Sequence, residues 1–149
     1  MAVGRKLAMK LLLDTHVLFW SLVDHEKMPA HFRRLLAEGD HSYRVSVVTG
    51  WEIATKVRIG KWPEASVLLP GLTEKVQEAR FDIEPLTLAQ AERAGSLTGD
   101  HKDPFDRLLA AQAANEGVDP GDGGRQIEGA RRALLVVNAP SLTALLAVP

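Results

Sequence analysis

The stretch that decides the fold reads Asp100-His-Lys-Asp103-Pro-Phe-Asp106-Arg-Leu-Leu-Ala-Ala-Gln-Ala113. Asp103 is well placed to cap a helix, and Pro104 follows at the first helical position, where its missing N–H is not needed. Apolar residues then recur at helical spacing, which predicts a helix that buries one face. Asp106 lies in the first turn, three residues after Asp103, so both carboxylates can point the same way.

Two interpretations of this acidic pair are open. Carboxylates crowded at one helix start repel each other unless a partner neutralises them, and a bound divalent cation is one such partner. The alternative is structural: Asp103 caps the helix, Asp106 interacts with the helix dipole, and an Asp–Arg pair forms with Arg107.

Composition limits the class of protein. The chain has 149 residues, 46% of them hydrophobic and 25% charged, which suits a single globular domain. Its net charge of -1 gives no overall basic field, so RNA would have to contact a local patch. The absence of cysteine excludes disulfides and thiolate metal sites and is typical of the reducing cytoplasm, where we expect the protein. No apolar run has membrane-spanning length, so we expect no membrane partner.

A second acid follows the first predicted strand. Residues 11–13 are a leucine run, typical of a buried parallel strand, and Asp14 comes directly after it. A helix is predicted to begin near Thr15. Ligands of open parallel sheets bind at the carboxyl ends of strands, so Asp14 lies where a functional group is expected. A simple helix cap is the alternative role.

A third acid repeats this arrangement. Residues 44–49 are predicted to form a short β-branched strand, followed directly by a helix that carries Glu52. Trp51 and Ile53 are expected to be partly buried. Helix capping explains one acid after a strand more easily than three. The alternative for Glu52 is a surface pair with Lys56, four residues later.

A basic turn follows this helix. Lys56, Arg58 and Lys61 could contact RNA phosphates, and Trp62, which we expect to be exposed, could stack on a base. A solvated basic loop is the alternative interpretation.

Four further elements are predicted. An amphipathic helix covers residues 29–37 with Phe32 inward, and a helix over residues 65–79 is bent or restarted at Pro70. Residues 81–86 alternate apolar and acidic, which predicts a half-buried strand near a sheet edge. Residues 88–97 are expected to be helical.

Three motifs carry a resemblance to a known family: Leu-Leu-Leu-Asp14-Thr-His-Val-Leu-Phe-Trp, Trp-Glu52-Ile-Ala-Thr-Lys with Gly60-Lys61, and Asp103-Pro-Phe-Asp106-Arg with Ala-Gln-Ala. Together they closely resemble the PIN-domain family, in particular its VapC-like toxin ribonucleases of bacterial toxin–antitoxin pairs. The resemblance covers about residues 9–117, with the motifs in the family's order.

The resemblance implies a fold and an activity. The fold would be α/β, a compact three-layer α/β/α sandwich around a parallel sheet. The activity would be Mg²⁺- or Mn²⁺-dependent cleavage of RNA, often transfer RNA, by a homodimer that has a cognate antitoxin. By position, Asp14, Glu52 and Asp106 match the family's acidic triad, and Asp103 matches an additional acid of this subgroup.

For the mechanism we expect metal-assisted phosphodiester hydrolysis, with Asp14 and Asp106 as primary metal ligands. Glu52 and Asp103 would act on the metal directly or through water. Among the polar neighbours we expect structural roles for His16 and His101, whereas Thr15 and Ser46 could orient a carboxylate or a water.

One family element is missing after residue 117. The family has a strand ending in Thr-x-Asp there, but residues 118–124 are rich in glycine and aspartate and cannot form an interior strand. The register puts Gly124 at the position of a fourth acid. Codons for Val118 through Arg125, shifted by one base, can spell Trp-Thr-Leu-Val-Thr-Ala-Asp, so we hypothesise a frameshift near residue 117 or 118.

These observations divide the chain into an N-terminal extension (1–8), a PIN-like domain (9–117) and an atypical C-terminal part of the same domain (118–149). An impaired module that binds antitoxin or RNA without cleaving it is the main alternative function. An aspartate-nucleophile phosphatase is disfavoured because Asp14-Thr15-His16 lacks a second aspartate two residues after the first.

Overall fold

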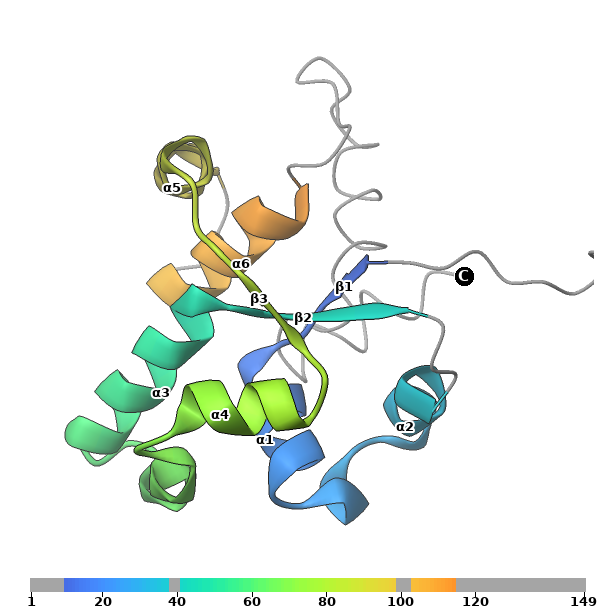
Figure 1. The fold of residues 1–149 in the computed structure, drawn as a ribbon. Helices are drawn as coiled ribbons and strands as arrows, with labels where there is room; N and C mark the ends of the chain where they lie inside the picture. The colour runs from blue at the N-terminus through green and yellow to red at the C-terminus, as the bar shows by residue number, and fades with distance from the viewer. Residues whose placement is uncertain (1–9, 38–40, 99–102, 115–149) are drawn as a thin grey trace, which may run out of the picture.

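The computed structural model describes residues 10–37, 41–98 and 103–114. Within these ranges a parallel sheet has the strand order β1-β2-β3 and lies between helices (Figure 1). The strands are β1 (Lys10–Leu12), β2 (Ser42–Ser46) and β3 (Asp82–Glu84). The helices are α1 (Thr15–Leu22), α2 (Ala30–Ala37), α3 (Val47–Arg58), α4 (Leu72–Glu78), α5 (Leu88–Ser96) and α6 (Pro104–Ala114), with 3₁₀ turns η1 (His25–Lys27) and η2 (Pro63–Leu68).

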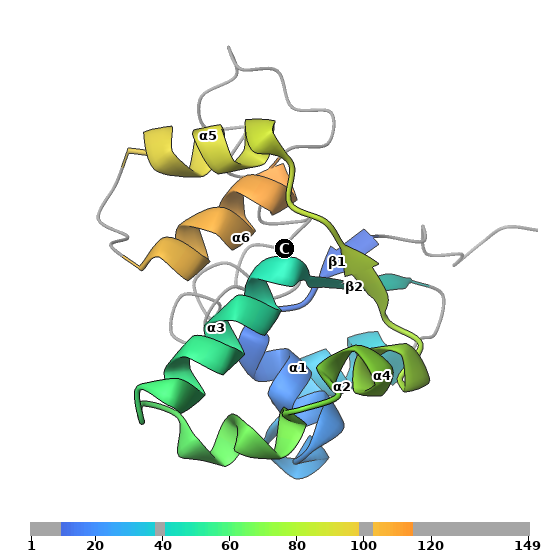
Figure 2. The same cartoon turned by 60° about the vertical axis from the view of Figure 1, so that its left-hand side comes forward.

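The leucine run at β1 supplies both faces of the sheet. Side chains alternate along a strand, so Leu11 and Leu13 join one buried cluster and Leu12 joins another. The larger cluster contains residues of α1, α2 and α4, and the smaller one contains residues of α6. Figure 2 shows α5 and α6 on one side of the sheet and α1, α2 and α4 on the other. The predicted α/β sandwich around a parallel sheet is confirmed.

The boundary between β2 and α3 differs from the prediction. A strand was expected over residues 44–49, but β2 ends at Ser46 and α3 begins at Val47. The Ser46 hydroxyl caps α3 by accepting a hydrogen bond from the Val48 backbone N–H at 3.0 Å. This cap outweighs the β preference of the residues that follow it. Glu52 therefore lies in the second turn of α3, not at its opening.

Two expectations about burial are wrong. The Trp51 residue is 56% exposed, although partial burial was expected, because α3 turns Glu52 and Ile53 toward the interior instead. The strand predicted to be half-buried is β3, and its Ile83 is 42% exposed. The expected edge position of β3 is confirmed for the sheet that the structure describes.

The remaining elements follow the predictions closely. Helix α2 buries Phe32, and α5 begins at a capping box between Thr87 and Gln90. The helix expected over residues 65–79 is divided into η2 and α4, with Pro70 between them. None of the described helices is long and apolar enough to cross a membrane. The predictions for residues 1–8 and 118–149 concern segments outside the described ranges and stay predictions.

Arg107 of α6 connects that helix to α5 through hydrogen bonds. Its Nε donates a hydrogen bond to the Ala94 carbonyl at 3.0 Å, and an Nη donates one to the Leu97 carbonyl. These carbonyls lie at the carboxyl end of α5, where the last helical carbonyls lack partners in the helix. The guanidinium thus supplies hydrogen-bond donors to carbonyls at the end of α5 and holds α6 against that helix.

Replacing this guanidinium should destabilise the protein. Arg107→Met keeps most of the apolar stem but removes hydrogen bonds from a charged donor, worth about 1.5–3 kcal/mol. For a chain of this size we expect the melting temperature to fall by about 3–12 °C. Circular dichroism melts would measure the change, with Arg58→Met on the exposed end of α3 as the control. Equal melting of both variants would contradict the role of Arg107.

Candidate active site

Asp14 lies at the junction of β1 and α1. Its carboxylate Oδ2 caps α1 by accepting a hydrogen bond from the His16 backbone N–H at 3.2 Å, and His16 Nδ1 lies 3.8 Å from the same oxygen. The Asp14 residue is only 3% exposed. Capping, the structural alternative for Asp14, is therefore confirmed, with Oδ2 as the acceptor of the His16 amide.

Glu52 comes from the second turn of α3 and points toward α1. The Thr15 hydroxyl donates a hydrogen bond to Glu52 Oε1 at 2.5 Å, and Lys56 Nζ donates one to Oε2. Glu52 is 4% exposed. The predicted pair with Lys56 forms, but it is largely buried and faces the other acids instead of lying on the surface.

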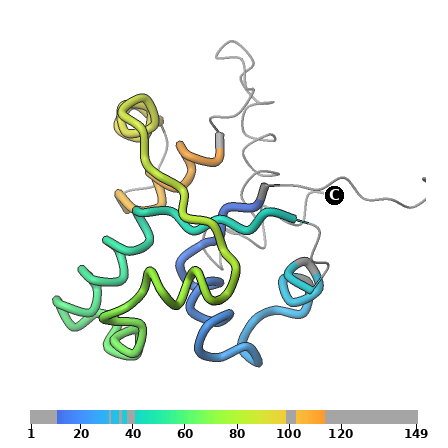
Figure 3. The backbone as a smooth tube through the Cα atoms, viewed as in Figure 1, coloured from blue at the N-terminus to red at the C-terminus, as the bar shows by residue number. Residues whose placement is uncertain are grey.

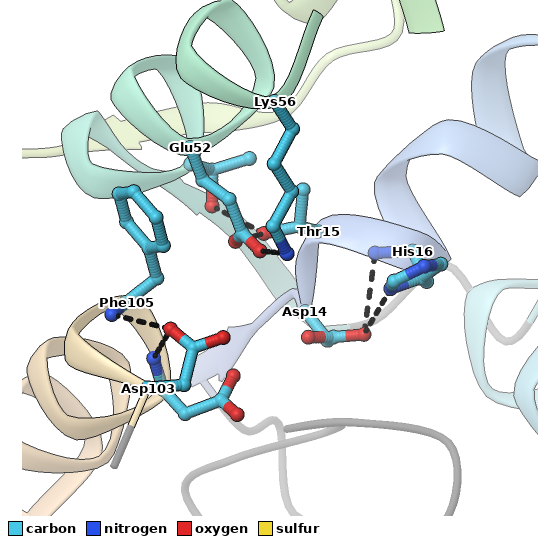
Figure 4. A network of polar contacts seen from close by, with 9 residues as sticks. Asp14, Thr15, His16, Glu52, Lys56, Asp103 and Phe105 are labelled. Carbon is cyan, nitrogen blue, oxygen red and sulfur yellow. Dashed lines mark hydrogen bonds and ion pairs between the residues drawn. The ribbon is translucent and has the colours of Figure 1, made fainter. Parts of the chain in front are cut away.

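Asp103 and Asp106 lie at the beginning of α6. Asp103 Oδ1 accepts hydrogen bonds from the backbone N–H of Phe105 at 2.8 Å and of Asp106 at 3.5 Å. With Pro104 at the first position of the helix, this confirms the predicted cap. The second oxygen of Asp103 is directed away from these amides (Figure 4).

Asp14 at the start of α1 interacts electrostatically with Glu52 of α3 and Asp106 of α6. Burial raises the pKa of Asp14 well above its usual range, the negative charge of Glu52 raises it further, and Asp106 adds to the effect. Backbone hydrogen bonds from His16 and Thr15 lower it, but not enough to compensate. A negative charge on Asp14 is therefore costly here, and a cation at this position would relieve that cost.

The predicted convergence of Asp14, Glu52 and Asp106 is found in part. The carboxylates of Asp14, Glu52 and Asp103 lie around one region between α1, α3 and α6 (Figure 4), and Asp106 is close enough to act on Asp14. However, among the residues that the structure describes, no three His, Asp or Glu side chains are grouped closely enough to hold a metal ion as they stand. Glu52 is turned toward Lys56.

The stacked rings of His16 and Trp62 lie beside Asp14. After α3, Gly60 adopts φ of +75° and the backbone reverses, so that η2 returns alongside α3 (Figure 3). Trp62 then stacks on His16 with ring centroids 4.7 Å apart and lies 5.1 Å from Phe19. Burial lowers the pKa of His16, which favours the neutral imidazole. This agrees with the structural role expected for His16; His101 lies outside the described residues.

Of the four predicted RNA-binding residues, two are exposed and two are partly buried. Arg58 and Lys61 are exposed around the turn after α3 and remain candidates for phosphate contacts. The expectation of an exposed Trp62 is wrong, since its ring is half-buried against His16. Lys56 is half-buried as well, and its ammonium faces Glu52 instead of solvent.

Gln112 is a buried polar residue of α6 that was not predicted from the sequence. Its Oε1 accepts a hydrogen bond from the Ser46 hydroxyl, and its Nε2 donates one to the Pro85 carbonyl at 3.2 Å. Ser46 was expected to orient a carboxylate or water, but its described partners are Gln112 and the Val48 amide. The sequence pattern that could have predicted its burial is its helical spacing from Phe105 and Leu109, which places this polar residue on the apolar face of α6.

The oxygen donors suit a hard divalent cation. Carboxylates are the ligands that Mg²⁺ and Mn²⁺ prefer, and these ions keep water molecules and open positions when few carboxylates hold them. Burial first, and then the charges of Glu52 and Asp106, raise the pKa of Asp14, so a bound cation would stabilise its charged form. In chemical type and charge, the acids therefore fit a metal site.

Comparison with known proteins identifies the family. No curated protein matches the chain significantly. The family model of the PIN domain matches residues 11–119, well over half of the 149 residues. This range contains all four acids of the candidate site. The chain therefore belongs to the PIN domain family, whose members are typically metal-dependent nucleases.

Proposed function

We propose that this protein is a VapC-like toxin, an endoribonuclease that uses Mg²⁺ or Mn²⁺ to hydrolyse RNA, with transfer RNA as a candidate substrate. One observation supports the proposal most strongly: Asp14, Glu52 and Asp106 come from distant parts of the chain, yet the charges of Glu52 and Asp106 both act on the Asp14 carboxylate. Helix capping alone gives no reason for these acids to meet.

Asp14 and Asp106 would hold the metal ion, and Glu52 and Asp103 would bind it directly or through water. When bound, the ion would stabilise charge on the phosphate and lower the pKa of an attacking water. The protein supplies the orientation of the acids. Thr15 holds Glu52, and the His16 amide fixes one oxygen of Asp14.

RNA would approach from the side of the exposed turn. Arg58 and Lys61 lie there, and cations on a surface turn attract the phosphate backbone without reading its sequence. Neither residue is engaged in the acidic site. We propose that they position RNA and take no part in bond cleavage.

The proposed partners are a second copy of this chain and a cognate antitoxin, and the proposed location is the cytoplasm. These proposals rest on the three sequence motifs of the VapC-like subgroup. Light scattering on the purified protein would determine whether it is a dimer. Co-purification with the product of a neighbouring gene would test for the antitoxin.

One observation favours the alternative function, a module that binds RNA or antitoxin without cleaving it. The family match ends at residue 119, next to the position where we hypothesise a change of reading frame. A missing fourth acid would leave the site with less charge to bind a metal. Mn²⁺ binding or RNA binding without cleavage would support this alternative.

We expect purified protein to cleave RNA with Mn²⁺ or Mg²⁺ and to lose this activity in EDTA. Asp106→Asn removes a proposed ligand and should reduce cleavage by at least about 100-fold, since metal stabilisation of the transition state is worth several kcal/mol. Glu78→Gln, an exposed acid on α4, is the matched control. Cleavage that persists in EDTA or in Asp106→Asn would contradict the proposed metal mechanism.

A further inference from the structure

Lys56 extends from α3 into the group of acids. Its Nζ donates a hydrogen bond to Glu52 Oε2 and lies 5.9 Å from the centre of the Phe105 ring, at the beginning of α6. The side chain is 24% exposed. Figure 4 shows the ammonium next to the Glu52 carboxylate, between the side chains from α3 and those from α1.

The positive charge of Lys56 acts on three of the four acids. Its burial lowers the pKa of the ammonium, but Glu52, through a hydrogen bond and its charge, raises it, and the charges of Asp103 and Asp106 add to this. The net direction is upward, so Lys56 stays charged at neutral pH. A cation with donors on a flexible stem can therefore partly neutralise the site without any metal.

A metal ion that bound Glu52 directly would share its carboxylate with Lys56. The Thr15 hydroxyl donates to Glu52 Oε1 and the Lys56 ammonium donates to Oε2. Each carboxylate oxygen has a second lone pair, so these hydrogen bonds alone do not exclude a cation, but a cation bound at Oε2 would lie next to the Lys56 ammonium. An ammonium and a divalent cation repel strongly at contact distance in a partly buried site. Displacement of Lys56 relieves this repulsion, whereas displacement of the neutral Thr15 hydroxyl does not.

We infer that Lys56 is an internal counterion, which neutralises Glu52 in the metal-free protein and competes with the divalent cation for the acidic site. The inference rests on the metal site of the proposed function and deepens it. Metal affinity would then depend on how easily Lys56 leaves Glu52. Lys56 is accordingly a positioning residue and not an RNA contact.

The test compares full-length Lys56→Met and Lys56→Gln with the parent protein. Isothermal titration calorimetry would measure the Kd for Mn²⁺, and thermal melting would measure stability with and without Mn²⁺. We expect both variants to melt at a lower temperature without metal, because the buried Glu52 carboxylate loses its counterion, and to bind Mn²⁺ on the order of tenfold more tightly. Lys56→Arg keeps the charge and should not bind more tightly.

The matched control is Lys27→Met. Lys27 pairs with Asp24 at 3.6 Å, and its side chain is 71% exposed, so its removal takes away the same charge far from the acids. Its Kd for Mn²⁺ should equal that of the parent. This control separates a local effect of Lys56 from the change in net charge.

Three results would overturn the inference. If the parent binds Mn²⁺ and the Met and Gln variants bind it no more tightly, competition is excluded while the metal site stands. If none of the proteins binds Mn²⁺, the proposed metal site fails and the competition fails with it. If Lys56→Met does not fold, Lys56→Gln and Lys56→Arg decide, and equal Kd values for these two would exclude competition by charge.

Discussion

The Asp14→Asn variant is expected to lose metal-dependent RNA cleavage by about 10³-fold and to melt at a higher temperature than the parent. Asparagine keeps the helix cap because its side-chain oxygen can accept from the His16 amide. It removes the charge that burial, Glu52 and Asp106 make costly. A gain in stability together with a loss of activity is typical of a site that needs a bound cation.

The gain in thermal stability of Asp14→Asn over the parent should depend on pH. The pKa of Asp14 is raised in the folded protein, so the stabilising effect of its proton is complete below the unfolded pKa of about 3.9 and is lost as pH rises through the folded pKa. The difference in melting temperature between Asp14→Asn and the parent should therefore grow from pH 4 upward. Thermal melts of both proteins across this range, without divalent cations, would measure it.

Asp82→Asn is the control for this prediction. Asp82 is an exposed carboxylate on the edge strand β3, so the same chemical change there should leave the pH profile of stability parallel to that of the parent. If Asp14→Asn melts below the parent at neutral pH, Asp14 is stabilised as an ion in the folded protein. The explanation that burial and the neighbouring acids make the charge of Asp14 unfavourable would then be wrong.

The second large effect is expected from Phe105→Ala. Phe105 is 8% exposed and packs with Leu12 and Leu109, and its ring meets Trp51 edge-on at 4.7 Å. Truncation of a buried phenylalanine costs about 3–5 kcal/mol from a total stability of about 5–15. We expect the melting temperature to fall by about 6–20 °C.

This variant should also weaken the acidic site. Phe105 holds the beginning of α6 against the sheet, next to the two aspartates of that helix, so RNA cleavage should fall even where most of the protein remains folded. Phe105→Leu fills much of the same volume and should recover most of the stability and activity. Thermal melts and cleavage assays on both variants would test this, and a stable, fully active Phe105→Ala would show that α6 docks without the ring.

Local capping rules predicted the beginnings of α1 and α6 correctly, because a side-chain acceptor at the cap acts within a few residues of itself. The same rule could have placed the start of α3 at Ser46. The β-branched residues after Ser46 favoured a strand instead, but the structure begins α3 there, with the Ser46 hydroxyl accepting a hydrogen bond from the Val48 amide.

The pair of Lys56 with Glu52 was predicted from their spacing, but the burial of Trp62 and the approach of Lys56 to the acids of α6 could not be predicted from sequence. Trp62 is half-buried because the turn after α3 brings it onto His16, which is distant in the chain. Lys56 faces the acids because α3 and α6 lie next to each other, and no local pattern encodes that arrangement. A basic residue near a predicted nucleic-acid site was therefore assigned to RNA, although its described contacts lie within the protein.

Gln112 links the two helices that carry most of the acids. Its amide joins the cap of α3, through Ser46, to the loop after β3, through the Pro85 carbonyl. Withdrawal of α6 from the sheet would break both hydrogen bonds and leave buried polar groups without partners. Local unfolding of α6 should therefore also loosen the first turn of α3, so that the backbone amides of both segments exchange with solvent as one cooperative unit.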